Sequence, residues 1–186
     1  MKVTMFLLSS LMLVTASSAE EDIWSKTINN DTNGVWHVQP DNPKPKDVKA
    51  QGIPGNMALR VKANKGVNPW DVQVSSPIKG TIKQGDVIMV MIYLRAEQPA
   101  EGGSSLATRL QLGEAPYSAT MEFNAAISTE WKSYCAHRVA GVTLPPGKGI
   151  ANIHLASAQQ VIDLGPVFVF DFGPDYDQST LKGCDG

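Results

Sequence analysis

The fold is decided by the stretch from Leu106 to Asn124, which reads LATRLQLGEAPYSATMEFN. In its first half, leucines alternate with Arg109 and Gln111, and a second alternation of apolar and polar residues starts at Tyr117. A period of two places the apolar side chains on one face of a β-strand and the polar side chains on the other. The stretch therefore predicts two half-buried strands.

Similar short runs recur along the chain, separated by Gly, Pro, Asn and Asp, and no long helical period follows residue 20. We expect strands at 34–39, 57–63, 70–75, 86–95, 106–112, 117–124, 131–139, 150–156 and 166–172, with a short strand or bulge at 160–163. Residues 87–94 and 167–172 are apolar on both faces, which predicts central strands or strands with a covered second face. About nine short strands separated by such turn residues predict an all-β fold, an antiparallel β-sandwich of the jelly-roll type.

The N-terminus predicts an export signal. Lys2 precedes an apolar run from Phe6 to Val14, and the small residues Ala16–Ala19 allow cleavage after Ala19. An uncleaved anchor is the alternative, but a membrane span needs about 20 apolar residues. We expect residues 1–19 to be a signal peptide, 20–173 the sandwich and 174–186 a C-terminal tail. The mature protein is then secreted or periplasmic, with no membrane span.

Composition excludes several classes of function. The chain has 186 residues, 42% of them apolar, and a net charge of −2 without a basic cluster, which argues against a nucleic-acid partner. Three histidines and two cysteines without ligand spacing argue against a zinc site, and we expect no required cofactor. An exported protein can form disulfides, so Cys135 and Cys184 are either a disulfide that fastens the tail or two free thiols. Lys44–Lys46 predicts a polar loop.

Enzyme signatures are weak. A retaining glycosidase needs two paired carboxylates, whereas Glu122 and Glu130 are isolated in the sequence. There is no Gly-x-Ser-x-Gly motif. Asn152–His154 resembles a lyase motif only faintly. We therefore predict no catalytic residues, with a glycan-active hydrolase as the least favoured reading.

Sugar binding fits the sequence better. Sugars stack their C–H faces on aromatic rings and form paired hydrogen bonds with planar amide, carboxylate or guanidinium groups. Three stretches combine such groups, and if their faces coincide they form one polar and aromatic strip. The candidate ligand-binding residues in these stretches are Trp70, Gln73, Tyr93, Arg95, Arg109, Gln111 and Tyr117.

Each candidate has a structural alternative. Trp70 is a core residue in the alternative reading, and Tyr93 is a buried tyrosine with one hydrogen bond. Arg95 and Arg109 are either solvated or paired with a nearby Glu97 or Glu114. His154 is more often a packed histidine than a ligand contact. Only the joint placement of the candidates favours a site.

The order of six segments resembles the carbohydrate-binding modules of families 4, 9 and 22, which are attached to bacterial xylanases and related hydrolases. The matching elements lie between Gly55 and Gly173. They are 58–61, 68–74, 82–96, 130–134, 153–160 and 163–169. The resemblance implies a β-sandwich with a cleft that binds a β-linked glycan without catalysis.

The resemblance also implies roles for single residues. Trp70 stands in the Pro-Trp segment that commonly lines the cleft, and Gln160 stands where a polar contact often precedes the last strand. Asp171 is implied to hold a structural calcium ion, for which oxygen ligands are suitable; the alternative is that Asp171 only ends a strand. The chain shows no linker or catalytic domain after residue 173, so we expect a free-standing module. It is a secreted glycan-binding protein, a part of a multi-protein complex or an orphaned domain with altered ligand choice, and a glycoside hydrolase acting in trans is one candidate partner.

Two functions remain open from the sequence. The first is an exported carbohydrate-binding protein for a polysaccharide or oligosaccharide, with xylan or glucan favoured. The second is a structural or protein-interaction sandwich of the cell envelope, which predicts an exposed apolar patch and no glycan binding.

Overall fold

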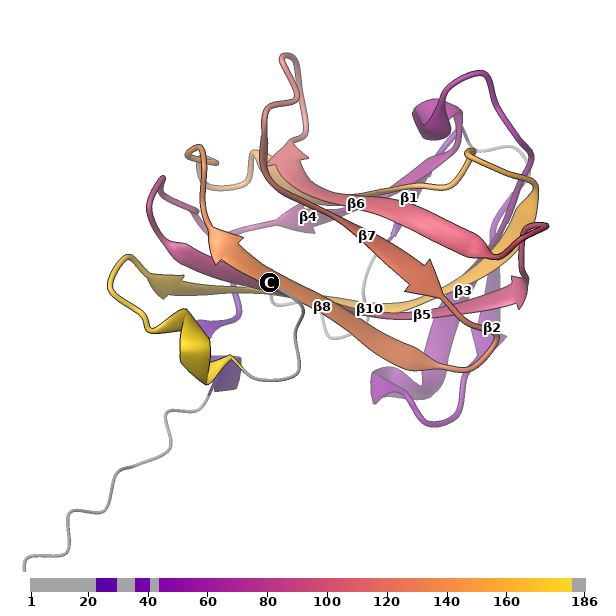
Figure 1. Cartoon of the computed structure of the whole chain (residues 1–186), viewed down its shortest axis with the longest axis horizontal. Helices are drawn as coiled ribbons and strands as arrows, with labels where there is room; N and C mark the ends of the chain where they lie inside the picture. The colour runs from indigo at the N-terminus through magenta and orange to yellow at the C-terminus, as the bar shows by residue number, and fades with distance from the viewer. Residues whose placement is uncertain (1–22, 30–35, 41–43, 182–186) are drawn as a thin grey trace, which may run out of the picture.

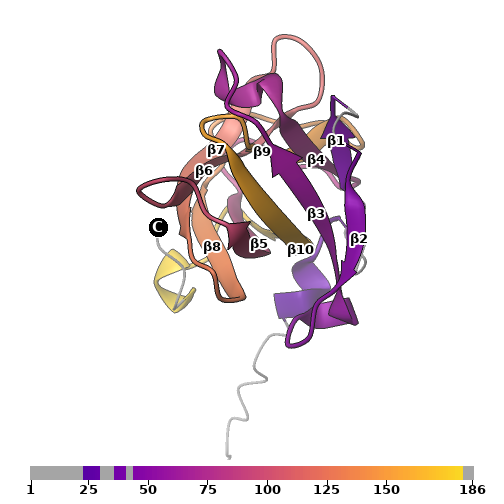
Figure 2. The same cartoon turned by 90° about the vertical axis from the view of Figure 1, so that its right-hand side faces the viewer.

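The protein is a sandwich of two five-stranded antiparallel sheets in a computed structural model, which describes residues 23–29, 36–40 and 44–181. The first sheet has the order β1-β4-β9-β6-β7 and the second the order β2-β3-β10-β5-β8. Figures 1 and 2 show the two sheets as stacked layers. The strands are β1 (His37–Gln39), β2 (Lys46–Lys49), β3 (Met57–Ala63), β4 (Gln73–Ile78), β5 (Val87–Gln98), β6 (Ser104–Leu112), β7 (Ala119–Ile127), β8 (Lys132–Val139), β9 (Gly149–His154) and β10 (Gln160–Gly173).

The main core lies between the sheets. Alternation within the strands directs Leu106 and Leu110 of β6, Val61 of β3 and Ile153 of β9 into it, and all four are at most 1% exposed. Side chains alternate between the two faces of a strand, and the apolar residues of these strands occupy the positions that face inward. The predicted β-sandwich is confirmed, with ten strands among the described residues instead of about nine.

The central strands of the second sheet are buried on both faces. β5 and β10 lie beside each other, and the outward side chains of Met89 and Phe170 belong to a second apolar cluster that includes Leu181. Trp24, from the 3₁₀ turn η1 (Ile23–Lys26), covers part of this cluster, and its ring centroid is 5.1 Å from that of Phe168. Part of the outer face of the second sheet is therefore covered by Trp24 and by the segment that carries Leu181.

Several local expectations differ from the structure. Trp70 and Tyr117, each expected to begin a strand, lie in a 3₁₀ turn and in a loop. The region predicted as a polar loop around Lys46 is the edge strand β2, which pairs with β3. Its side chains are mostly exposed, so it carries no alternation. The two runs at 160–163 and 166–172 join into β10, with an irregular register between Leu164 and Val167.

The predicted signal peptide, residues 1–19, lies outside the described residues. Within the described part of the chain, no helix has the length and apolar character needed to cross a membrane.

Candidate functional site

A cleft of about 520 Å³ lies on the outer face of the first sheet. Four of the five strands of this sheet contribute to its floor, and its two ends are formed by loops. The lining residues are Gln39, Trp70, Gln73, Ser75, Arg109, Gln111, Gly113, Tyr117, Ile150, Asn152 and His154.

Strand register brings these residues into rows across the sheet. Gln39 of β1 lies opposite Gln73 of β4, which lies opposite His154 of β9. In the next row, Asn152 of β9 lies opposite Arg109 of β6. Residues paired across strands point to the same face, so side chains that are more than a hundred positions apart in the sequence meet in one cleft.

Trp70 stands at one end of the cleft, on the short 3₁₀ turn η3 (Pro69–Asp71). Trp70 is 53% exposed, so it is not a core residue. The Asp71 carboxylate accepts hydrogen bonds from the backbone N–H groups of Val67 and Asn68, at 2.8 and 2.9 Å. These bonds, with that to Asn68 the larger effect, lower the pKa of Asp71.

The segment before Trp70 is fastened to the end of β9. Gly66 N–H donates to Ala156 O at 2.9 Å, and Ala156 N–H donates to Pro69 O at 3.0 Å. A Cβ atom at Gly66 would lie 2.7 Å from Asp71 Oδ2, so only glycine fits here without a shift. The Trp70 ring is therefore presented by a tightly fixed turn.

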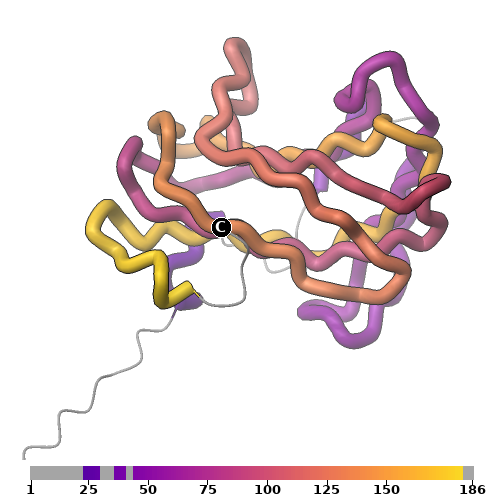
Figure 3. Tube along the Cα trace, in the orientation of Figure 1, coloured from indigo at the N-terminus to yellow at the C-terminus, as the bar shows by residue number. Residues whose placement is uncertain are grey.

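Tyr117 stands at the other end, in the loop 113–118 between β6 and β7. Tyr117 is 53% exposed and its φ angle is +58°. Its N–H donates to Glu114 O at 2.8 Å, and Gly113 N–H fixes the base of the loop by donating to Lys148 O at 2.9 Å. Figure 3 shows this loop and the segment that carries Trp70 rising above the same sheet. The cleft thus has an exposed aromatic side chain at each end.

The floor between the two rings is made of buried amides. Gln111 is 4% exposed and Asn152 is 1% exposed. Asn152 Nδ2 donates to Gln73 Oε1 at 2.8 Å. Asn152 Oδ1 and Gln111 Oε1 are buried and have no hydrogen-bond partner among the described residues. Buried polar atoms are normally paired, so these two acceptors are unusual features of the floor.

Arg109 carries a positive charge in the cleft lining and pairs with the carboxylate of Glu122. Arg109 Nε donates to Glu122 Oε1 at 2.8 Å, and the Glu122 side chain is largely exposed. His154 is 8% exposed, and its ring centroid lies 6.0 Å from that of Trp70 in an edge-to-face arrangement. Burial, and then the Arg109 cation, lower the pKa of His154. The imidazole is therefore biased toward its neutral form.

The structure brings five of the eight predicted ligand-binding residues into this cleft: Trp70, Gln73, Arg109, Gln111 and Tyr117. It does not bring the other three there. Tyr93 and Arg95 lie on β5 of the second sheet. Gln160 is 3% exposed, and its Nε2 donates to Leu155 O at 2.8 Å, so this amide packs inside the sandwich. The expected single strip with Tyr93 and Arg95 does not form, because β5 and β6 belong to different sheets.

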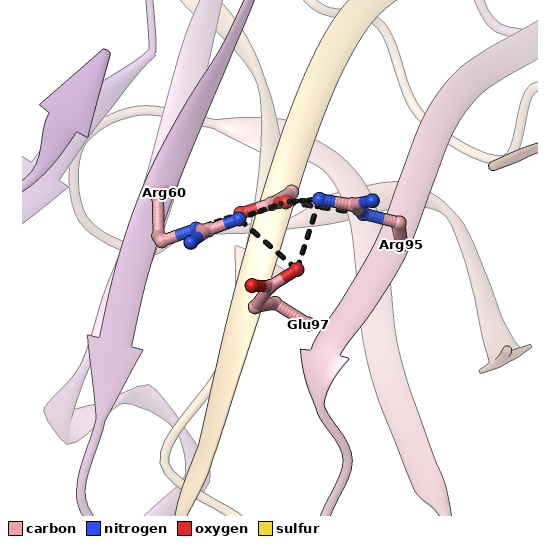
Figure 4. Close-up of polar contacts among 4 residues, drawn as sticks. Arg60, Arg95 and Glu97 are labelled. Atoms are coloured by element: carbon pink, nitrogen blue, oxygen red, sulfur yellow. Dashed lines mark hydrogen bonds and ion pairs between the residues drawn. The ribbon is translucent and has the colours of Figure 1, made fainter. Parts of the chain in front are cut away.

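Arg95 takes part in an ion network across the second sheet (Figure 4). Asp163 of β10 lies between Arg60 of β3 and Arg95 of β5, and its side chain is fully buried. Arg60 donates to its two oxygens at 2.7 and 2.9 Å, and Arg95 Nη2 donates to Oδ2 at 2.6 Å. Glu97 bridges both guanidinium groups at 3.0 and 2.9 Å, and Arg95 also lies over the ring of Trp131. The charged groups of this network therefore already have partners in one another.

Sequence reasoning missed part of the floor. His154 is buried, as expected of a packed histidine, but it also lines the cleft, and Asn152 lies beside it. The signal was present, because Asn152 and His154 alternate with the buried Ala151 and Ile153. Gln39 and Ser75 on the neighbouring strands carried no comparable signal.

The predicted metal residue lies elsewhere. Asp171 is half-buried at the end of β10 and lines a second cavity of about 390 Å³ with Asp86. Burial is the main cause that raises the pKa of Asp171, and the nearby Asp86 adds to it. Calcium takes six to eight oxygen ligands, and the described residues contain no group of three or more His, Cys, Asp or Glu that could hold a metal ion. Two carboxylates fit a calcium site only if backbone carbonyls and water complete it.

Cys135 of β8 is disulfide-bonded. Its predicted partner, Cys184, lies outside the described residues, so the pairing stays a prediction.

Comparisons with known proteins place the fold. No protein-family model matches the chain, and no curated protein sequence matches it. Among solved structures, the second N-terminal cellulose-binding domain of Cellulomonas fimi β-1,4-glucanase C has 15% identity and a TM-score of 0.54, with 83% of this chain and 97% of that chain covered. A CBM4 structure has 17% identity and a TM-score of 0.52, with 61% of this chain and 83% of that chain covered.

A longer enzyme chain contains a similar domain. The arabinose-bound α-L-arabinofuranosidase MgGH51 has 13% identity and a TM-score of 0.55, with 78% of this chain but only 25% of the enzyme chain covered. These similarities extend over most of the described sandwich. The chain therefore has the β-sandwich fold of carbohydrate-binding modules.

Proposed function

We propose that this chain is an exported, non-catalytic carbohydrate-binding protein whose site is the cleft between Trp70 and Tyr117. The observation that carries the proposal is the joint placement of two exposed aromatic side chains and a floor of buried amides. Aromatic rings stack on the C–H faces of sugars, and planar amides make paired hydrogen bonds with their hydroxyl groups. Gln73 and Arg109, which are half-buried in the cleft lining, supply polar groups for such hydroxyl groups.

The proposed ligand is a β-linked polysaccharide or oligosaccharide, with xylan or glucan favoured. The cellulose-binding domain of similar fold supports this class of ligand. Among the described residues, the cleft lining contains no Asp or Glu, which favours binding over hydrolysis. Binding by stacking and a few hydrogen bonds gives millimolar to micromolar affinity, on the order of −4 to −8 kcal/mol. A glycoside hydrolase acting in trans is the proposed partner.

The test is a titration of intrinsic tryptophan fluorescence with xylo-, cello- and manno-oligosaccharides. We expect a saturable change with one series, because Trp70 is exposed at the cleft. A Trp70→Phe variant should lose most of this fluorescence change, because it lacks the indole, although it keeps an aromatic ring at this position. A folded protein that binds none of these sugars, nor other β-linked glycans by calorimetry, would contradict the proposal and support a protein-interaction role.

We also propose that Asp171 and Asp86 hold a structural calcium ion. The pair of carboxylates at one cavity supports this proposal. Calcium that binds only the folded state increases the free energy of unfolding by about 2.7 kcal/mol at a hundredfold excess over Kd, and the Tm rises as a result. Thermal unfolding with calcium and with EDTA measures the effect, and Asp171→Asn should remove it. Equal Tm values in both buffers would contradict the proposal.

A further inference from the structure

The polar atoms that the cleft floor opens to solvent differ from those that it buries. Arg109 Nη1, Gln111 Nε2 and His154 Nδ1 make no hydrogen bond with any described residue. None of them is among the buried polar atoms that lack a partner, so all three nitrogens are open to solvent, and their side chains line the cleft. The unpartnered oxygens, Asn152 Oδ1 and Gln111 Oε1, are buried and meet no ligand.

The open nitrogens are hydrogen-bond donors. Guanidinium and amide nitrogens only donate, and His154 Nε2 lies 3.4 Å from the amide nitrogen of Asn152, so Nε2 accepts and the ring proton is on Nδ1. Side-chain oxygens nearby already have donors, because Gln73 Oε1 accepts from Asn152 at 2.8 Å and Gln39 Oε1 accepts from Gln73 at 3.5 Å. The hydroxyl group of Ser75 can donate or accept. The floor therefore presents mainly donors to a ligand.

Arg109 supplies the charge of this surface. Among the described residues that line the cleft, Arg109 alone is charged at neutral pH, because burial lowers the pKa of His154. Its Nε and Nη2 both contact one oxygen, Glu122 Oε1, at 2.8 and 2.5 Å. This contact uses one edge of the planar guanidinium and leaves the edge with Nη1 free. Glu122 lies outside the lining, and its side chain is 60% exposed.

The second sheet shows that one guanidinium of this protein can hold two carboxylates. Arg95 Nη2 donates to Asp163 Oδ2 at 2.6 Å and to Glu97 Oε2 at 2.9 Å (Figure 4). Arg60 contacts the same two carboxylates. Within the part of the chain that the structure describes, no second carboxylate reaches Arg109. The free edge of Arg109 is therefore available to a carboxylate that a ligand brings.

We propose that the cleft selects glycans that carry uronic acids, and that Arg109 binds their carboxylate through its free edge. This selectivity rests on the carbohydrate-binding function proposed above and names the ligand class within it. A carboxylate accepts hydrogen bonds and does not donate, so it matches a floor of donors better than a hydroxyl group does. Charge-assisted hydrogen bonds are also about twice as strong as neutral ones. Gln111 Nε2, two residues along the same face of β6, supplies a further donor.

The first experiment compares two pairs of oligosaccharides by calorimetry at neutral pH. Xylotetraose is compared with xylotetraose that carries one glucuronic acid branch, and cellotetraose with cellotetraose in which one C6 is oxidised to a carboxylate. We expect the acidic member to bind about tenfold more tightly, with a smaller preference at about 0.5 M salt. Its methyl ester keeps a carbonyl acceptor without the charge and should lose most of the preference. A sulfate ester that binds as tightly as the carboxylate would overturn the assignment to uronic acids.

Three variants test whether Arg109 is the cause of this preference. Arg109→Gln removes the charge, so the ratio of acidic to neutral affinity should fall to about one, whatever its affinity for the neutral sugar. Glu122→Gln removes the competing carboxylate and should raise the ratio about threefold. Lys148→Gln is the matched control, because it removes an exposed cation that pairs with Glu114 outside the lining. It should keep the wild-type ratio.

The second experiment needs no oligosaccharide. Sodium glucuronate is titrated into the protein, with glucose as the control, while ¹⁵N NMR follows Arg109 Nε–H and the side-chain NH₂ of Gln111. We expect both signals to shift with glucuronate and not with glucose. If they do, but no β-linked glycan binds, the proposed function fails and the carboxylate-binding cleft stands. If the glycans bind but the acidic members are not favoured, or Arg109→Gln keeps the tenfold ratio, the proposed selectivity is overturned and the proposed function stands.

Discussion

The outer face of the first sheet and the outer face of the second both carry arginine, carboxylate and aromatic side chains. On the second sheet, the buried carboxylate of Asp163 binds Arg60 and Arg95, and Trp131 lies against Arg95. On the first sheet, the corresponding buried groups are amides, two of which keep an acceptor without a partner among the described residues. The type of side chain is therefore a weaker guide to a binding site than whether its hydrogen-bonding and charged groups already have partners within the protein.

The largest effect should come from the second sheet. Asp163→Ala leaves two arginines without their buried counterion, and removal of one partner of a buried ion pair costs about 3 kcal/mol of unfolding free energy. Urea unfolding measures this loss. Glycan affinity per folded molecule should stay within about twofold of the wild-type value, because the network lies on the opposite sheet. A large loss of affinity at unchanged stability would mean that the second face belongs to the binding site.

The matching change on the first sheet should affect binding instead. Trp70→Ala removes an exposed ring, so the free energy of unfolding should change by less than about 1 kcal/mol. Loss of the stacking surface should weaken glycan binding by about 2 kcal/mol, roughly thirtyfold. Calorimetry and urea unfolding on the same sample separate the two quantities. Unfolding of the variant, with binding retained in the folded fraction, would make Trp70 a packing residue.

The two outer faces differ in how well the sequence predicted them. Alternation correctly placed Arg109 and Gln111 on one face of β6, and Arg95 on one face of β5, because a period of two is a local property. It did not reveal that β5 and β6 enter different sheets, since strand order depends on contacts far apart in the sequence. The family resemblance implied that Gln160 is a contact, but Gln160 is 3% exposed and its Nε2 donates to Leu155 O.

A third change tests how strictly the Trp70 turn must be fixed. Gly66→Ala places a Cβ atom 2.7 Å from Asp71 Oδ2 and 2.9 Å from Asn68 O, so the turn must shift. We expect a loss of about 1 kcal/mol in glycan binding, roughly fivefold. Gly141→Ala is the control, because its Cβ atom would meet only Thr120 O at 3.8 Å. Equal affinities for the two variants would show that the turn tolerates movement.

The smallest effects should come from the exposed carboxylates of the two faces. Glu97→Ala and Glu122→Ala each remove a partly exposed ion-pair partner, and such pairs contribute about 0–1 kcal/mol. Both variants should unfold within this range of wild type in urea. Glu122→Ala should also change the salt dependence of glycan binding, because it leaves Arg109 unpaired at the cleft, whereas Glu97→Ala should not. Identical salt dependence for both variants would place Arg109 outside the site.

The fastened turn at Trp70 has a consequence for the kinetics of recognition. Its backbone is held to Ala156, two residues after β9, by hydrogen bonds of Gly66 and Pro69, and the carboxylate of Asp71 already accepts backbone hydrogen bonds. The conformational entropy of this turn is therefore lost when the protein folds, and a ligand does not have to order it again. Association should be a single step whose observed rate rises linearly with sugar concentration in stopped-flow fluorescence.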